Sequence, residues 1–332
     1  MKFIIKKNIL LENLLNTSKA ISSKNLIPIL TGIKFELLEE GLYLSASDSD
    51  ISIRTFIDKD KITSIEQTGS VVISGKYIVE IIKKLPDNDI IIEVIDGYNM
   101  IIQTTGSEFN LNGIDPNEFP NLDLEETKNP IVLNPVTFKN IINQTFFATS
   151  QNESRPLLTG INFSIKDNLL EVIATDSYRL SLKKYKMEKS LTKDVNIIIP
   201  SRNLTELLKL FFDESEEMLN IYIFGNKIIF KFNNIIFQSR LINGSYPNTV
   251  NLIPNETLFD LRINKREFYN MVDRASILNN DRDNNIITLE INNNLLKITS
   301  MSLEIGKVEE KLAINCSDNI KISFSSKYMM DA

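Results

Sequence analysis

The chain has 332 residues, with 37 Lys or Arg against 43 Asp or Glu and a formal net charge of −6. It has no histidine and a single cysteine, Cys316, which excludes histidine-dependent triads and dyads, the common histidine-ligated zinc sites and an intramolecular disulfide. Its eleven glycines are too widely spaced for a Walker A loop or a dinucleotide-binding fingerprint. We therefore expect no metal and no cofactor.

Length and hydropathy set the broad class. The length predicts two or three domains. No stretch approaches the ~18 apolar residues of a membrane span, and the N-terminus has no apolar core of the kind that a secretory signal needs. We expect a soluble, cytoplasmic protein. The negative net charge argues against a nucleic-acid binder that uses its whole surface, but it is compatible with a local basic face.

The first predicted element is an amphipathic helix near the N-terminus, where Leu10, Leu14 and Ala20 recur at helical spacing. Alternating strands follow over residues 28–49, and a short β-rich run then leads into a second helix at Gly75. That helix gives way to the alternating strands of IIIEVIDGYNMIIQTT. The predicted unit is strand, helix and three strands, and it occurs twice.

The same series recurs further along the chain. Residues 156–177 repeat residues 28–49 with a shift of 128 positions, and ten of these 22 positions are identical. A weaker copy at 286–302 keeps the apolar alternation of the strands. Counterparts of the Gly75 helix are expected to begin at Ser201 and Ser326. The repeats predict three tandem domains.

The predicted fold class is α+β, with tandem domains that each consist of two β-α-β-β-β halves. The expected divisions are domain 1 at 1–121, a linker at 122–130, domain 2 at 131–249 and a partial domain 3 at 250–332. Relative to the first domain, the third is shorter by roughly 40 residues and stops inside its second helix. We therefore expect the third domain to be incomplete.

Several motifs carry a family resemblance that extends from end to end of the chain. They are MKFIIKKNILLENLL, LIPILTGIKF, EFPNLD at 118–123, SRPLLTGI and ATDSYRLS within 154–181, and LINGSYPNTVNLIP at 241–254. Together they resemble the bacterial DNA polymerase III beta subunit, the replication sliding clamp. The resemblance implies a non-catalytic processivity factor that forms a head-to-tail homodimeric ring, with helices lining a hole for duplex DNA and sheets outside.

The resemblance also implies a basic lining for the hole. Because encirclement holds DNA topologically, a loose lining is sufficient, and tight binding at many phosphates would impede sliding. Any one of these basic residues could instead belong to an ordinary solvated helix face. The candidate DNA-binding residues are Lys24, Lys76, Lys83, Lys84, Lys139, Arg155, Arg202 and Lys209.

The expected partners, besides double-stranded DNA, are the replicative DNA polymerase, the clamp loader and repair polymerases. In the family they bind through short linear motifs in a hydrophobic cleft between the second and third domains. Each leucine of this cleft, taken alone, could instead be a core strand residue. The candidate partner-peptide residues are Leu158, Thr175, Ser177, Tyr178, Arg179, Leu180, Pro247, Leu252 and Tyr328.

The resemblance also implies which residues form the subunit interface of the ring, namely two apolar pairs. Phe109 and Leu111 resemble one side of the subunit interface, and Ile277 and Leu278 resemble the other. An incomplete third domain would leave a sheet edge unpaired, so we expect the polypeptide to be a monomer or a weak, aggregation-prone dimer.

Two other readings remain open at this stage. A truncated paralogue would bind clamp partners without encircling DNA. A carboxylate-dependent enzyme would use Asp176 of the repeated pairs Asp48-Ser49 and Asp176-Ser177. The second is the weaker reading, because Asp-Ser after a strand is a common turn.

Overall fold

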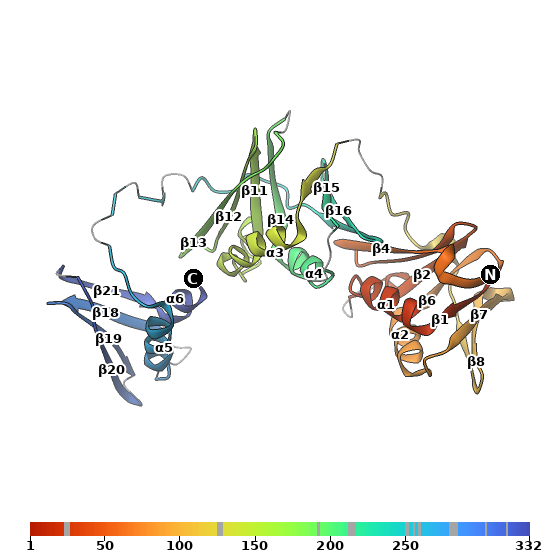
Figure 1. Cartoon of the computed structure of the whole chain (residues 1–332), viewed down its shortest axis with the longest axis horizontal. Helices are drawn as coiled ribbons and strands as arrows, with labels where there is room; N and C mark the ends of the chain where they lie inside the picture. The colour runs from red at the N-terminus through yellow and green to blue at the C-terminus, as the bar shows by residue number, and fades with distance from the viewer. Residues whose placement is uncertain are drawn as a thin grey trace. The chain divides into compact units, whose positions relative to one another are not determined.

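The chain forms two compact units, Met1–Tyr246 and Pro247–Ala332. The structure is a computed structural model (Figure 1). It describes residues 1–22, 27–124, 129–190, 193–211, 217–249, 252–254, 256–257, 260–278, 285–302, 304–316 and 318–332.

The first repeat of the larger unit alternates one helix with groups of strands. Its first half has the predicted order, whereas its second half has an additional strand, β5, which pairs with β1. The elements are β1 Lys2–Lys6, α1 Lys7–Ser18, β2 Gly32–Leu38, β3 Gly41–Ser47, β4 Ile51–Asp58, β5 Ile62–Gln67, β6 Gly69–Ser74, α2 Gly75–Lys84, β7 Asp89–Ile95, β8 Asn99–Thr104 and β9 Ser107–Asn112.

The second repeat has the predicted order in both halves. Asn134 caps its first helix by accepting hydrogen bonds from the backbone N–H groups of Val136 and Thr137, and Pro135 occupies the first helical position. The elements are β10 Ile131–Leu133, α3 Pro135–Asn143, β11 Gly160–Lys166, β12 Leu169–Thr175, β13 Leu180–Lys186, β14 Val195–Pro200, α4 Ser201–Leu208, β15 Leu219–Phe224, β16 Lys227–Phe232 and β17 Ile235–Arg240.

The smaller unit contains the third repeat. Its helix α5 buries Met271, Val272 and Ala275 against a four-stranded sheet, which gives this unit a hydrophobic core of its own. The sheet has the order β20-β19-β18-β21. The elements are α5 Lys265–Ser276, β18 Ile286–Asn292, β19 Leu295–Ser302, β20 Gly306–Ala313, β21 Ile320–Ser325 and α6 Ser326–Asp331.

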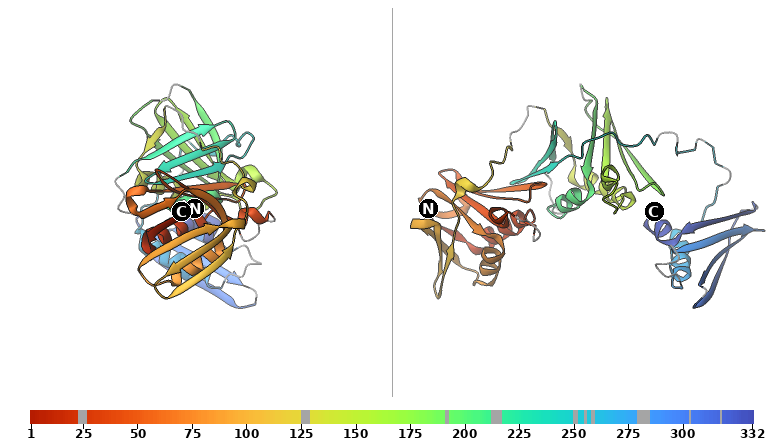
Figure 2. Two further views of the ribbon diagram at one scale, coloured as in Figure 1. Left: turned by 90° about the vertical axis from the view of Figure 1, so that its right-hand side faces the viewer. Right: turned by 180° about the vertical axis from the view of Figure 1, so that it is seen from behind.

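The two halves of each repeat in the larger unit exchange their first strands. β1 pairs with β7 of the other half, and β6 pairs with β2. In the same way β10 pairs with β15, and β14 pairs with β11. Each helix therefore connects two different sheets. In Figures 1 and 2 the pair α1 and α2 lies against the sheets of the first repeat, and the pair α3 and α4 lies against those of the second.

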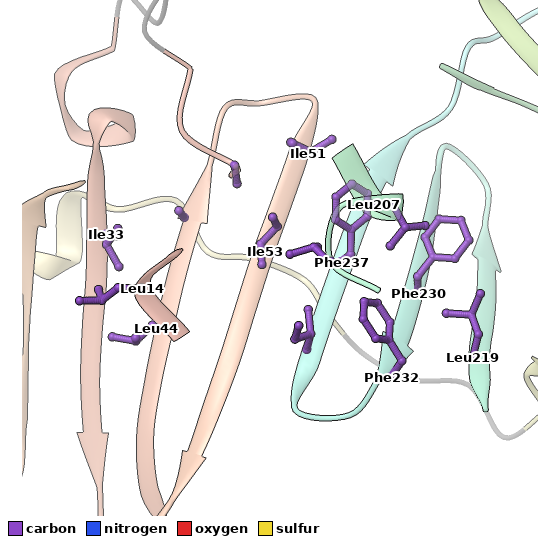
Figure 3. Close-up of a cluster of buried hydrophobic side chains, with 14 of the residues drawn as sticks. Leu14, Ile33, Leu44, Ile51, Ile53, Leu207, Leu219, Phe230, Phe232 and Phe237 are labelled. Carbon is purple, nitrogen blue, oxygen red and sulfur yellow. The ribbon is translucent and has the colours of Figure 1, made fainter. Parts of the chain in front are cut away.

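A continuous sheet joins the first repeat to the second. The last strand of the second repeat, β17, pairs antiparallel with β4 of the first, which gives an eight-stranded sheet of order β10-β15-β16-β17-β4-β3-β2-β6. Phe237 lies opposite Ile53 in this pair, and both side chains are completely buried in one core shared by the two repeats (Figure 3). Asn234 of the second repeat also links the two repeats by donating hydrogen bonds to Asn13 Oδ1 and to the carbonyl oxygen of Phe56, at 2.7 and 2.9 Å.

Candidate partner-binding and nucleic-acid surfaces

A repeated turn carries most of the predicted partner residues in the larger unit. The Oδ1 atom of Asp176 accepts hydrogen bonds from the backbone N–H groups of Tyr178 and Arg179, at 2.9 and 3.0 Å. Ser177 has a φ of 80°, in the left-handed region. Asp48 and Ser49 repeat this geometry in the first repeat. The interpretation of Asp-Ser as a turn is confirmed.

Both carboxylate oxygens of Asp176 have hydrogen-bond partners within this turn. Its second oxygen accepts a hydrogen bond from the Nε of Arg179 at 3.1 Å, and the two side chains are only 11% and 16% exposed. The Arg179 guanidinium also lies 5.4 Å from the centre of the Phe147 ring. With both oxygens committed to the turn, Asp176 is a structural residue, and nothing in its geometry favours an enzymatic role.

The turn brings together five of the predicted partner residues. Thr175 is buried and donates its hydroxyl hydrogen to the carbonyl oxygen of Arg179, at 2.6 Å. Tyr178 is 84% exposed and Leu180 begins β13. The remaining two are Ser177, at the tip of the turn, and Arg179.

Two further candidates lie beside this turn. Leu158 is buried in the short 3-10 helix before β11, and β11 is the strand that pairs with β12, at whose end the turn begins. Arg155, predicted to bind DNA, donates a hydrogen bond from Nη1 to Ser177 Oγ at 3.0 Å. One of the DNA candidates thus contacts one of the peptide candidates directly.

Tyr246 is a residue of this site that the sequence analysis missed. Its hydroxyl oxygen accepts a hydrogen bond from the backbone N–H of Thr175 at 3.0 Å. Burial raises the pKa of Tyr246 to about 12, an effect that the Thr175 hydrogen bond opposes and the nearby Asp176 charge reinforces. The tyrosine lies inside the GSYPNTVNLIP motif, so the motif located the segment, but its spacing could not identify the hydrogen-bond partner 71 residues away.

We expect Tyr246→Phe to lower the free energy of unfolding by about 1–3 kcal/mol, because it leaves the buried N–H of Thr175 without an acceptor. Burial favours the neutral phenol and raises the pKa of Tyr246 above that of a tyrosine in the unfolded chain. The contribution of Tyr246 to the free energy of unfolding is therefore complete below about pH 10 and is lost as the pH rises toward 12. Urea unfolding at neutral pH and near pH 11 measures both effects. Tyr178→Phe, at an exposed position of the same turn, is the control, and an equal loss in both variants would contradict the assignment.

The other three partner candidates belong to the smaller unit. Pro247 is exposed, and Leu252 is 66% exposed. Tyr328 lies in α6 and donates its backbone N–H to Ser325 Oγ at 3.5 Å. The exposed Leu252 side chain is an apolar group available for contact with a partner.

The predicted DNA residues occupy exposed helix faces in several cases. Lys76, Lys83 and Lys84 are exposed on α2, whose opposite face buries Ile78 and Ile82. Lys139 is half-buried on α3, whereas Arg202 on α4 is exposed and Lys209 follows that helix directly. Lys24 lies outside the described residues.

Two of these basic residues have acidic neighbours. Lys209 forms an ion pair with Glu206, with 2.7 Å between Nζ and Oε1. Arg202 and Arg240 line an open pocket of about 620 Å³ whose wall also includes Asp48, Asp50 and Glu153. These carboxylates reduce the positive potential that Lys209 and Arg202 offer to a phosphate.

Lys19 was not predicted, and it lies beside the predicted Lys209 in a basic cluster where the two repeats meet. Lys19, after α1, donates a hydrogen bond from Nζ to the carbonyl oxygen of Lys209 at 2.6 Å. Burial lowers the pKa of Lys19, and the charge of Lys209 acts in the same direction, while Glu206 opposes them. Lys19 comes from the first repeat and Lys209 from the second, and no local pattern places them together.

One predicted interface pair lies on an edge strand, and the other follows a helix. Phe109 and Leu111 belong to β9, the outermost strand of its sheet, and Phe109 is 37% exposed. Ile277, directly after α5, is 73% exposed, and Leu278 is half-buried. Exposed apolar side chains on a sheet edge mark a surface for pairing with another chain.

Within the described residues, no helix is both long and apolar enough to cross a membrane. The same described part of the chain holds no group of three or more side chains suited to binding a metal ion.

Models of the DNA polymerase III beta subunit match the chain in three parts: the N-terminal domain at 1–123, the central domain at 132–248 and the C-terminal domain at 250–332. The beta sliding clamp of Bacillus subtilis is 42% identical over 339 residues, covering 100% of this chain and 89% of that protein.

Two solved structures are similar over the whole chain and over 89% of their own length. The DNA polymerase sliding clamp from Bacillus subtilis has a TM-score of 0.96 at 41% identity. The beta subunit from DNA polymerase of Streptococcus pyogenes has a TM-score of 0.95 at 31% identity. The predicted fold of tandem clamp domains is confirmed.

Proposed function

We infer that the chain, which belongs to the DNA polymerase III beta subunit family, is a DNA sliding clamp. It binds DNA and the replicative polymerase and makes that polymerase processive, with no catalysis of its own. We place it in the cytoplasm, and we retain the domain boundaries at 1–121, 131–249 and 250–332 as part of the proposal.

The observation that carries this proposal is the sheet that continues from one repeat into the next. β17 ends the second repeat and pairs with β4, the edge of the first. The counterpart of β17 in the first repeat is β9, and the counterpart of β4 in the third is β20; both are edge strands of their sheets. Repeating the observed junction joins β9 of one copy to β20 of a second. We propose that the same junction forms in the other direction as well, so that two copies close head to tail.

The predicted interface pairs fit this arrangement. Phe109 and Leu111 alternate along β9, so both side chains are on one face of the strand. α5, which Ile277 and Leu278 follow, contacts β20. We propose that the two pairs meet across the subunit junction. The expectation of a monomer or weak dimer stays a prediction.

We propose that the helix faces carry the DNA contacts. Lys76, Lys83 and Lys84 form an exposed row on α2, and Lys19 and Lys209 form a cluster where the repeats meet. Their number is small in a protein of net charge −6, which suits a ring that holds DNA topologically and slides. The proposal retains the other predicted basic residues, Lys24, Lys139, Arg155 and Arg202.

We expect the double variant Lys83→Ala with Lys84→Ala to weaken binding to a short DNA duplex and to reduce the slope of log K against log salt by about 0.9 for each phosphate that the variant no longer neutralises. Lys61→Ala, an exposed lysine between β4 and β5, is the control. Fluorescence anisotropy over a series of salt concentrations gives both slopes. Equal slopes for the double variant and the wild type would place the DNA-binding residues elsewhere.

We propose that partner peptides bind the nine predicted residues. Thr175, Ser177, Tyr178, Arg179 and Leu180 form one turn, with Leu158 next to the same sheet, and Tyr246 braces the turn through its hydrogen bond with Thr175. The predicted set also includes Leu252, an exposed apolar side chain of the smaller unit, and Pro247 and Tyr328 of the same unit. Short linear segments are recognised by such combinations of apolar contact and backbone hydrogen bonding.

Primer extension on a singly primed circular template tests the function. With the polymerase and clamp loader of the same organism, the protein is expected to convert short products into products that run around the whole circle. Product lengths that do not change on adding the protein would contradict the assignment as a processivity factor.

A further inference from the structure

Three lysines surround one carboxylate at the edge of the sheet of the smaller unit. On β20, the Glu309 carboxylate is within 3.3 Å of the Nζ atoms of three lysines: Lys307 and Lys311 from the same strand, and Lys297 from β19. These three ion pairs lower the pKa of Glu309 to about 2. The cluster has two positive charges in excess, and it lies on a strand at the edge of its sheet.

The observed pairing of β17 with β4 gives the register in which a strand of a second copy would pair with β20. The third copy follows the second by 126 positions, so Ser300 corresponds to Ala174 and to Ala46. Ala46 lies opposite Ile53 as Ser300 lies opposite Val308, so Ile53 is equivalent to Val308. Arg54 is likewise equivalent to Glu309.

The other strand of the junction has its own counterpart. Phe230 lies opposite Phe237 as Ile102 lies opposite Phe109, so Phe237 is equivalent to Phe109. Ile236, one position earlier, is equivalent to Glu108.

Transferring the register places Phe109 opposite Val308. In the observed junction the equivalent residues, Phe237 and Ile53, are both fully buried. Successive residues of a strand point to opposite faces, so Glu108 is then on the outer face, directly opposite Glu309. Its diagonal neighbours on that face are Lys307 and Lys311, within the reach of long side chains.

We propose that Glu108 of one copy docks between Lys307 and Lys311 of a second copy, so that two carboxylates share three ammonium groups across the junction. This docking rests on the proposed closure of two copies into a ring, and it identifies an electrostatic contact between the two copies. Glu108 is exposed in the chain, and its Oε2 accepts a hydrogen bond from Gln103 Nε2 at 2.8 Å, which holds the carboxylate on β9. Repulsion between Glu108 and Glu309 is offset because the lysines surround both.

The other edge strand with which β9 could pair is β13, and its side chains fit β9 less well than those of β20. β13 is the counterpart of β4 in the second repeat, and its equivalent positions are Ser181 for Ile53 and Leu182 for Arg54. Pairing β9 with β13 would set Phe109 against a serine and Glu108 against a leucine. Pairing with β20 instead sets Phe109 against a valine, and it sets Glu108 opposite Glu309 but diagonal to two lysines.

The test is the dimer dissociation constant of Glu108→Lys and of the charge swap Glu108→Lys with Lys307→Glu. We expect Glu108→Lys to weaken the dimer about tenfold, since two attractive diagonal pairs become repulsive and outweigh the attraction that the new ammonium gains to Glu309. The swap should recover most of that loss. Glu39→Lys, in the turn between β2 and β3, is the matched control and should leave the constant unchanged. Analytical ultracentrifugation at about 0.05 M and about 0.5 M NaCl measures all variants, and the effect should shrink at high salt.

The outcomes separate this inference from the function on which it rests. A dimer that is indifferent to Glu108→Lys and to salt would overturn the docking of Glu108 and leave the ring intact. A wild-type protein that stays monomeric throughout would overturn both.

Discussion

Replacing Phe109 with aspartate is expected to weaken the dimer by at least about 100-fold. Phe109 is 37% exposed in the chain, and its equivalent Phe237 is completely buried where the two repeats join. Burying a phenylalanine contributes about 1.5–3 kcal/mol, and an unpaired carboxylate in its place costs more still. Since the contact occurs twice in a closed ring, the loss is doubled.

The folded chain itself should tolerate this change, because the side chain is at an exposed edge. Thermal unfolding of Phe109→Asp at a concentration where the wild type is monomeric should match the wild type, and light scattering at higher concentration should show the monomer only for the variant. Ile95→Asp is the matched control, since Ile95 is an exposed apolar residue of the same sheet, 47% exposed at the end of β7. A Phe109→Asp dimer as tight as that of the control would place the interface elsewhere.

Replacing Leu252 with aspartate is expected to weaken binding of a partner peptide by at least about tenfold. Leu252 is 66% exposed, so the substitution removes an apolar contact with the ligand and not a core contact. Burial of a leucine side chain on binding contributes about 1.5–3 kcal/mol, which corresponds to roughly 10- to 150-fold in affinity.

The measurement is isothermal titration with a synthetic peptide that carries the clamp-binding segment of the polymerase from the same organism. Ile253→Asp is the matched control, because the neighbouring isoleucine is also exposed, at 44%, and was not among the predicted partner residues. Unchanged affinity in Leu252→Asp, or the same loss in both variants, would remove Leu252 from the site.

Local patterns predicted the helices, most of the strands and the Asp-Ser turn. The apolar periodicities of the helices and strands recur in each repeat, so they could be recognised in the sequence. The Asp-Ser turn, with its serine at positive φ, depends only on hydrogen bonds between residues close in sequence. The additional strand β5 was not predicted, because ITSIEQ follows β4 closely and its pairing with β1 is decided by contacts some sixty positions apart.

Long-range placement could not be predicted from local patterns in the same way. The exchange of first strands between halves and the pairing of β17 with β4 bring together segments far apart in the chain. Tyr246 with Thr175 and Lys19 with Lys209 depend on that placement. The family resemblance identified the Thr175 turn, but the contacts of Arg179 with Asp176 and Phe147 required the structure.

Retention on circular DNA tests the central claim most directly. The protein is loaded by the clamp loader onto nicked circular DNA, separated from free protein by gel filtration, and divided into a sample left circular and a sample cut once by a restriction enzyme. A clamp that encircles duplex DNA stays with the circle at high salt and leaves the linear molecule by sliding off its ends. Equal retention on both forms, or dissociation from the intact circle, would contradict it.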